Sequence, residues 1–407
     1  MAKRRTRVAA IDVGTTKVCT IMADTDGDGP PRILGVGIVP SKGMHKGMVI
    51  NSNEAKASIR ESVNKAERIA GYKLESACVG VTGRHVSSVN NKGVIAITRN
   101  DKLVRPSDLK RVLNVARTVK VPDEQELLHV IPRTFAVDGQ EGVKNPVGMH
   151  GFRLDVETHI ITAGVTSVQN LVKCIRGIGI DIDDLVLEPL ASAEAVLTEE
   201  EKEKGVMLAD IGGGTTDIAV FKDNTIYHTS VLPVAGYQIT RDISVGLNIP
   251  FELAESMKKK YGNLLLVNDS KSSRNNNDDR TLTEDGHSVS YRDLSEILHV
   301  RLEELLRLMI LELPRSDYAK LIPSGLVLCG GSANLPGIAE LGQETTRLPV
   351  RVGRPIGLSG VSDALNDPAY ATSVGLLLWK KRNEGVQTWQ PQSNVRRLLT
   401  KMFGFFR

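Results

Sequence analysis

Two segments of this chain, far apart in the sequence, place the same residues between apolar runs. One begins at Ile11 and reads IDVGTTKVC, and the other begins at Ala209 and reads ADIGGGTTDIAV. In each, a run with strand composition ends at Asp-x-Gly and a second apolar run follows the Thr-Thr pair, which is typical of strand, tight turn and strand. A repeat of this kind predicts two similar lobes that face one another across a cleft.

The residues in these turns indicate a phosphate ligand. Glycine allows several backbone N–H groups to approach one phosphate closely, and threonine adds hydroxyl donors. The strand-end aspartates, Asp12 and Asp210, can hold Mg²⁺ through its water ligands while the ion bridges phosphate oxygens. A single glycine turn is often only a hairpin, but two matched turns and a third glycine turn are far more specific. The predicted phosphate-contacting residues are Gly14, Thr15, Thr16, Gly212, Gly213, Gly214 and Thr215.

Five motifs resemble those of the actin, hexokinase and DnaK superfamily of ATPases and occur along the chain in the order found in that superfamily. IDVGTTK and LADIGGGTTDIAV resemble its two phosphate motifs, VLCGGSANLPG its adenosine motif, and LEPLASAEAVL and AYATSVGLLLW its two connecting helices. Within the superfamily the chain resembles the FtsA family of bacterial cell-division proteins, because LHVIPRTFAVDGQEGVKNPVGMHGFRL is similar to that family's distinctive insert. The resemblance implies an α/β, actin-like, two-lobed ATPase fold with an inserted α+β subdomain of the SHS2 type.

The resemblance also implies a division of the chain into subdomains. The core of lobe 1 is expected at 1–83 and 361–383, and the core of lobe 2 at 163–245 and 315–360. The insert is expected at 84–162, and a further subdomain of lobe 2 at 246–314. Residues 384–392 have the composition of a linker and residues 393–407 that of an amphipathic helix. The polar segment 268–288 is interpreted as a mobile loop.

Further site residues are proposed from position and resemblance. Lys17 either neutralises phosphate charge or faces solvent from a strand. Glu188 either orients the attacking water, as the resemblance implies, or is a helix N-terminal Glu favoured by the dipole; with Asp12 it is the candidate catalytic residue, and any ATPase activity is expected to be slow. Asp217 is interpreted as the end of a turn.

The far side of the nucleotide is expected to meet a second group of residues. Glu255 and Lys258 lie at i and i+3 on one helix face, where they either contact ribose and base or form only an exposed ion pair. Gly236 and the turn Gly330, Gly331 and Ser332 complete the predicted nucleotide contacts. The helix at 294–312 has a mostly core-type apolar pattern, but its Arg301 is a candidate contact, by resemblance, for the C-terminal peptide of the tubulin-like division protein FtsZ.

The last fifteen residues carry the net charge of the whole chain. The formal charge is +4, and SNVRRLLTKMFGFFR holds four basic and no acidic residues, so the rest is neutral. This argues against nucleic-acid binding, which needs a basic face on a folded domain. Placed on a helix, the apolar residues form one stripe with the basic residues beside it, as in helices that lie in a bilayer interface. The predicted membrane contacts are Val395, Arg396, Arg397, Leu398, Leu399, Lys401, Met402, Phe403, Phe405 and Phe406. The alternative is a terminal helix docked on the protein's own core.

Composition excludes several other classes of protein. The four cysteines form no CxxC pair, so free thiols are expected, and the eight histidines lack metal-ligand spacing. No signal peptide and no apolar run near ~20 residues is present, so the chain is expected at the cytoplasmic face of the cell membrane as a peripheral protein.

Three functions are compatible with these patterns. The resemblance favours an ATP-dependent filament that anchors the FtsZ ring to the membrane, recruits later division proteins through 84–162, and binds ATP and Mg²⁺. A pilus-assembly adaptor of the PilM type and a small-molecule kinase of the same superfamily are the alternatives. The kinase would need a second-substrate pocket with a catalytic Asp, for which the sequence offers no clear candidate.

Overall fold

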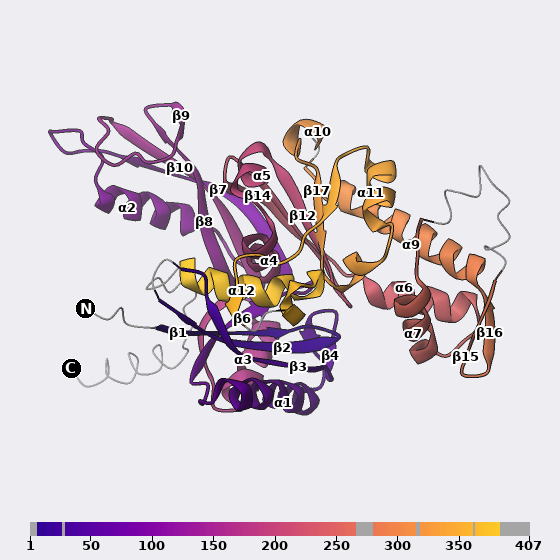
Figure 1. The fold of residues 1–407 in the computed structure, drawn as a ribbon. Coiled ribbons are helices and arrows are strands. Elements are labelled where there is room, and N and C mark those ends of the chain that lie inside the picture. The colour runs from indigo at the N-terminus through magenta and orange to yellow at the C-terminus, as the bar shows by residue number, and fades with distance from the viewer. Residues whose placement is uncertain (1–5, 27–28, 266–279, 315–317, 361–362, 383–407) are drawn as a thin grey trace.

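Two β-sheets carry the two repeated hairpins (Figure 1). The computed structural model describes residues 6–26, 29–265, 280–314, 318–360 and 363–382. The first sheet has the order β11-β6-β1-β2-β3-β19. Its strands are β1 (Thr6–Val13), β2 (Lys17–Thr25), β3 (Arg32–Pro40), β6 (Ser76–Val81), β11 (Asp181–Leu187) and β19 (Ser359–Gly360). The first motif is the β1–β2 turn, with Asp12 at the end of β1.

The second sheet repeats this plan around the second motif. Its order is β14-β13-β12-β17-β18, and β12 pairs antiparallel with β13 and parallel with β17. The strands are β12 (Val206–Ile211), β13 (Thr216–Lys222), β14 (Thr225–Leu232), β17 (Leu326–Cys329) and β18 (Val350–Val352). Alternate residues of β12 join the cores on opposite faces of this sheet, so both faces are covered, as the continuous apolar run predicts.

One predicted boundary is wrong. We expected residues 163–245 in lobe 2, but α3 (Val165–Arg176) leads into β11, which lies parallel to β6 in the first sheet. The reason is packing: Leu185, Val186 and Leu187 of β11 are fully buried in the core shared with β1 and β6. Lobe 1 therefore extends to the end of β11.

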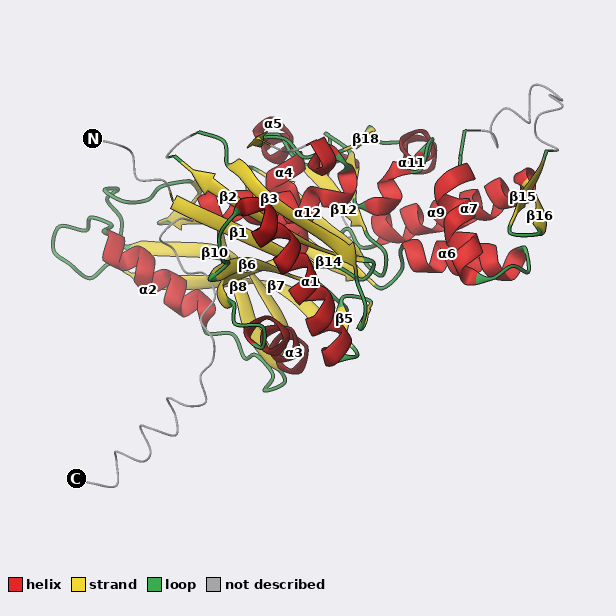
Figure 2. Ribbon diagram, turned by 60° about the horizontal axis from the view of Figure 1, so that its bottom comes forward, coloured by secondary structure: helices red, strands yellow, loops and turns green. Residues whose placement is uncertain are grey.

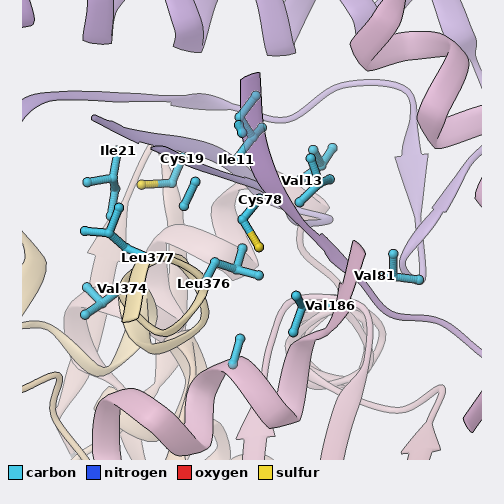
Figure 3. Close-up of a cluster of buried hydrophobic side chains, with 14 of the residues drawn as sticks. Ile11, Val13, Cys19, Ile21, Cys78, Val81, Val186, Val374, Leu376 and Leu377 are labelled. Atoms are coloured by element: carbon cyan, nitrogen blue, oxygen red, sulfur yellow. The ribbon is translucent and has the colours of Figure 1, made fainter. Parts of the chain in front are cut away.

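Helices α4 (Glu188–Val196) and α12 (Ala371–Arg382) cross between the two sheets (Figure 1). Figure 3 shows Val374, Leu376 and Leu377 of α12 beneath the apolar side chains of β1, β2 and β6. A Cβ atom on Gly375 would overlap the carbonyl oxygen of Ala191, so the two helix backbones touch at this point. Only a glycine permits this approach.

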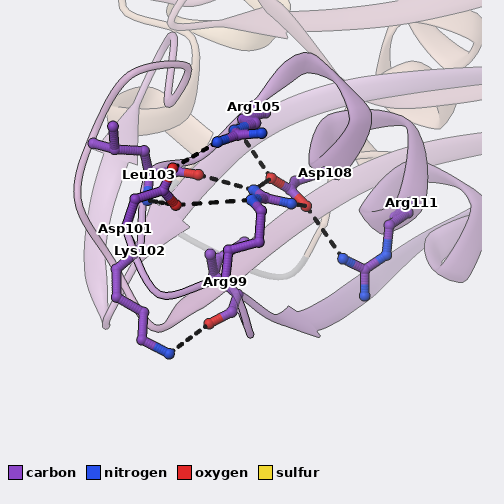
Figure 4. Close-up of polar contacts among 8 residues, drawn as sticks. Arg99, Asp101, Lys102, Leu103, Arg105, Asp108 and Arg111 are labelled. Atoms are coloured by element: carbon purple, nitrogen blue, oxygen red, sulfur yellow. Dashed lines mark hydrogen bonds and ion pairs between the residues drawn. The ribbon is translucent and has the colours of Figure 1, made fainter.

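The inserted residues form a separate sheet with its own small core. The order is β7-β10-β8-β9, from β7 (Val86–Ala96), β8 (Gln125–Val137), β9 (Gln140–Val143) and β10 (Arg153–Gly164), and α2 (Pro106–Arg117) packs on it. At its tip the buried carboxylate of Asp108 accepts hydrogen bonds from Arg99 and Arg111 and from the backbone N–H of Arg105 (Figure 4). These donors hold the pKa of Asp108 below its usual value, the Arg99 hydrogen bond first among them.

A helical unit lies at the opposite end of the molecule (Figure 2). It contains α6 (Gly236–Gly246), α7 (Phe251–Tyr261) and α9 (Tyr291–Leu311), around the buried apolar residues of α9. The predicted loop at 268–288 is wrong for its second half, because β15 (Thr281–Glu284) and β16 (His287–Ser290) form a hairpin. Leu282 and Val289 pair across it and are buried, which a polar composition conceals.

The remaining elements are short or peripheral. Helix α1 (Ser52–Ala70) covers β2 and β3; its N-cap is Asn51, and it ends at Gly71, which has a left-handed backbone conformation. The others are β4 (Met44–His45), β5 (Met48–Val49), α5 (Glu199–Lys204), α10 (Tyr318–Leu321), α11 (Ile338–Thr346), and the 3₁₀ turns Gly331–Asn334, Asp363–Asn366 and Pro368–Tyr370. The predicted linker 384–392 and amphipathic helix 393–407 lie outside the described residues. Within the described ranges, no helix has the length and hydropathy to cross a membrane.

Candidate functional site

The two glycine-threonine turns meet across the lobes. A Cβ atom on Gly213 would overlap the side chain of Thr16, and one on Gly214 would lie 2.6 Å from Thr15 Oγ1. Larger side chains in the second turn would therefore collide with the first. Between the turns is a cavity of about 50 Å³, which suits phosphate groups rather than a whole nucleotide. The predicted residues that line it are Asp12, Gly14, Thr15, Thr16, Lys17, Glu188, Asp210, Gly212, Gly213, Gly214, Thr215, Gly330 and Gly331.

The start of α6 and the third glycine turn both form hydrogen bonds to the backbone of the second glycine turn (Gly212–Gly214). The N–H of Gly236 donates to the carbonyl oxygen of Gly212 at 3.1 Å, and the hydroxyl of Ser332 donates to the same oxygen at 3.3 Å. Gly330 has φ of 84°, and a Cβ there would overlap the carboxylate of Asp210. Gly236 and Ser332 thus fix the turn's backbone and do not line the 50 Å³ cavity.

Hydroxyl groups from the two central helices hold the two strand-end aspartates. Ser373 of α12 donates to Asp12 Oδ2 at 2.6 Å. Ser192 of α4 and Thr372 of α12 donate to Asp210 Oδ2 at 2.7 and 2.9 Å. The sequence analysis missed these three residues. Their signal is the presence of small hydroxyl residues, one in α4 and two at the start of α12, at buried positions that only the packed fold brings to the aspartates.

Asp217 belongs to the site, and its interpretation as merely the end of a turn is wrong. It is buried, lines the cavity, and accepts hydrogen bonds from Thr215 at 2.9 Å and from Thr82. Thr82 follows β6 in lobe 1 while Asp217 lies on β13 in lobe 2, so this bond joins the lobes directly. Thr82, also missed by sequence, follows an ordinary apolar strand and carries no motif.

The cavity concentrates negative charge. Burial, and then the neighbouring carboxylates, raise the pKa of Glu188 well above its usual value, while Lys17 opposes this. Burial likewise raises the pKa of Asp12, against the opposing effects of Lys17 and Ser373. Lys17 lines the cavity, so the prediction that it neutralises phosphate charge gains support over a solvent-facing position.

These residues fit a hydrated Mg²⁺ with a polyphosphate. A divalent cation would compensate the charge of these carboxylates and favour their ionised form, against the burial that raises their pKa values. Among the described residues no three His, Cys, Asp or Glu side chains are placed to ligate a metal together. Contact through water and phosphate oxygens, as predicted for Asp12 and Asp210, therefore suits this donor set better than an all-protein cage.

Without Mg²⁺ and nucleotide, the contribution of Asp217 to the free energy of unfolding should fall as the pH rises from about 4 to 7. Burial raises the pKa of Asp217 from 3.8 to about 7. Since the folded state then keeps a proton that the unfolded chain releases, raising the pH through this window favours unfolding. Asp217→Asn should remove this component, which amounts to about 4 kcal/mol at most, given about 1.4 kcal/mol per pKa unit.

Urea unfolding at pH 4.5, 6.0 and 7.5 measures this effect. The exposed Asp181 supplies a matched control, and Asp181→Asn should leave the wild-type pH profile intact. Parallel profiles for wild type and Asp217→Asn would contradict the assignment.

Glu255 and Lys258 lie next to the cavity and not in its lining. Lys258 Nζ donates to Glu255 Oε2 at 2.6 Å, to Thr240 Oγ1 at 2.7 Å and to the carbonyl oxygen of Gly236 at 3.2 Å. Lys258 is buried, so the pair is more than an exposed surface ion pair. It braces the start of α6, and its contact with ribose and base remains a prediction.

Arg301 lies on the surface of the helical unit. It donates to Asp242 of α6 and, at 2.6 Å, to Glu304 of its own helix, and its side chain is 28% exposed. It is therefore held in place beside two carboxylates, away from the cleft.

The fold is similar to that of several solved structures. A complex of type IV pilus biogenesis, PilM–PilN, matches with a TM-score of 0.62 at 17% identity, covering 92% of this chain and 98% of that one. MreB5 of Spiroplasma citri bound to ADP matches with a TM-score of 0.53 at 15% identity, covering 93% and 98%. Two facing lobes with paired Asp-led turns define an actin-like protein.

Sequence relatives identify the family more closely. Cell division protein FtsA of Pseudomonas aeruginosa is 41% identical over 384 residues, covering 93% of this chain and 91% of the relative. The Bacillus subtilis protein of that name is 37% identical over 380 residues, covering 93% and 84%. The chain belongs to the FtsA family. Family models for cell division protein FtsA and for the SHS2 domain inserted in FtsA match residues 207–375 and 83–162. The PilM alternative has support only from the fold.

Proposed function

We propose that this cell-division protein binds ATP with Mg²⁺ between its lobes, polymerises on the cytoplasmic face of the cell membrane, and anchors FtsZ there. The observation that carries the nucleotide part is the meeting of two Asp-led glycine turns around one small, strongly acidic cavity. The family membership supports the role in division. The MreB neighbour was solved with ADP, which supports a nucleotide as the ligand.

Different residues of the cleft would contact the phosphates, compensate charge and orient the aspartates. Backbone N–H groups of the two turns and Lys17 would face the phosphates, and Mg²⁺ would supply charge neutralisation between the phosphates and the carboxylates. Ser192, Thr372 and Ser373 hold the aspartates in orientation. Glu188 would orient the attacking water, and any hydrolysis is expected to be slow.

Anchoring would involve three separate segments of the chain. The amphipathic sequence 393–407 would bind anionic lipid, and filament formation would present many such segments together, so that weak single attachments add up. The surface around Arg301 would bind the C-terminal peptide of FtsZ, and the inserted sheet would bind later division proteins.

Reconstitution with FtsZ tests this proposal. Fluorescent FtsZ should be recruited to anionic vesicles only with this protein and Mg-ATP present, and negative-stain images should show filaments on the lipid. Arg301→Glu should reduce FtsZ recruitment about tenfold, because a hydrogen bond to a charged group contributes about 1.5 kcal/mol. Arg307→Glu, on the same helix and paired with Glu303, is the matched control. FtsZ recruitment that is equal with and without this protein would refute the proposal.

A further inference from the structure

A second, larger cavity shares no lining residue with the cavity between the glycine turns. It is a groove of about 860 Å³, within the size range of pockets that enclose small-molecule ligands. Its lining residues come from α2 and β8 of the inserted subdomain and from α4, α5, the β13–β14 hairpin and α12, elements that Figure 1 shows. It holds no glycine turn, so nothing in it matches the phosphate site.

The groove has an apolar interior. Its lining includes Leu113, Val130, Ile131, Phe221, Ile226 and Trp379. Several of these side chains are only half-buried, although they pack against the main core or the core of the inserted sheet. Covering them would remove apolar surface from water at about 25 cal/mol per Å². An amphipathic segment with one apolar face would provide such a cover.

The last described helix, α12, ends at this groove. Arg382, at the end of α12, is itself a lining residue and is held by Glu194 of α4 at 2.8 Å. The ten residues 383–392 separate it from the amphipathic segment 393–407. Ten residues span at most about 33–36 Å, and so short a tether gives an effective concentration of about millimolar. Even weak docking would then be populated.

The groove is lined by four Lys or Arg side chains and three Glu side chains, and one of these carboxylates is buried. Glu126 of β8 lines the groove, is 3% exposed, and its Oε1 has no hydrogen-bond partner among the described residues. Burial raises its pKa. A buried polar atom without a partner is costly, and a basic side chain in the groove would satisfy it. The segment 393–407 offers four basic residues and no acidic one.

We propose that this groove binds residues 393–407 of the same chain, covering their apolar stripe until a membrane competes for it. The inference rests on the proposed membrane role of this segment and adds its regulation. The same Leu, Met and Phe side chains cannot lie in the groove and in the bilayer together, so docking would lower the apparent lipid affinity by the fraction of chains whose segment is free.

Trp379 provides a direct readout. The chain has two tryptophans, so Trp389→Phe leaves Trp379, in the groove wall, as the single fluorophore. In that full-length background and without lipid, Leu398→Glu with Phe403→Glu should increase acrylamide quenching of Trp379 and shift its emission to the red. A synthetic peptide of sequence SNVRRLLTKMFGFFR should reverse both changes. Identical quenching with and without the two tail substitutions would overturn the proposal.

A matched pair on α2 tests competition with lipid. Asn114 and Val115 are exposed neighbours, of which only Asn114 lines the groove. Asn114→Arg should raise the fraction bound to anionic vesicles at limiting lipid by about threefold, as expected if roughly one-third of wild-type segments are free. Val115→Arg adds the same charge and should leave binding unchanged. Equal binding by both variants would overturn the regulatory role.

The two proposals fail separately. If no variant binds vesicles but the tail substitutions still change Trp379 quenching, the membrane role is wrong and the docking stands. If vesicles bind normally and quenching never changes, the docking is wrong and the membrane role stands.

Discussion

Asp210→Ala is expected to abolish Mg²⁺-dependent ATP binding, with a loss of at least about a hundredfold in affinity. Asp210 is buried in the cleft and is oriented by the hydroxyls of Ser192 and Thr372. Removing the carboxylate removes a charge that would face the hydrated ion, and losing a charge-assisted contact in a buried site costs about 3 kcal/mol, or about a hundredfold. Titration calorimetry with ATP, with and without Mg²⁺, measures this.

Asp210→Asn separates lost charge from lost structure. The asparagine side-chain oxygen can still accept from Ser192 and Thr372, so the fold should persist while Mg²⁺-dependent binding is lost. Asp181→Ala, at an exposed position, should bind as wild type. Wild-type affinity in Asp210→Asn would refute the assignment of the cleft as a Mg-nucleotide site.

Deleting residues 393–407 should abolish co-sedimentation with anionic vesicles and leave ATP binding intact. The segment holds all of the net charge and a continuous apolar stripe, and each Lys or Arg near an anionic surface contributes about 1 kcal/mol. Binding by the intact chain should also weaken as salt increases or as neutral lipid replaces anionic lipid.

A scrambled segment is the stringent control for this deletion. A chain whose last fifteen residues keep their composition and charge but lose the helical stripe should bind vesicles weakly, since charge alone remains. Undiminished sedimentation of the deleted chain would show that the contact lies elsewhere.

Local sequence predicts most of the residues that line the small cavity between the turns, because each turn is specified by residues next to one another in the chain. Glycine, threonine and aspartate at the end of a strand specify a turn whose function depends on its own backbone, and two copies specify two lobes. Ser192, Thr372, Ser373 and Thr82 could not be predicted in the same way. They reach the aspartates only after helices and strands distant in the chain have packed, and a lone hydroxyl residue carries no motif.

The errors in the fold have the same origin. A strand such as β11 reads identically whether it joins one sheet or the other, and its pairing with β6 is settled by burial of its apolar face. The β15–β16 hairpin escaped notice because two buried residues, Leu282 and Val289, suffice to seat it within a polar segment. Asp217 was interpreted as a turn residue because its sequence neighbours do not show that it is buried. Its burial, which raises its pKa, arises only when the two lobes pack together.

The backbone contact between Gly375 and Ala191 provides a point about which α4 and α12 could rotate relative to one another. Ser192, Thr372 and Ser373, which hold the aspartates of both lobes, lie within one helical turn of this contact. A force on these carboxylates would therefore act close to the point about which the two helices rotate. The inserted sheet and the α6–α9 unit lie at opposite ends of the molecule (Figure 2), far from this contact. A slight tilt at the aspartates would therefore produce a larger displacement at those distant surfaces.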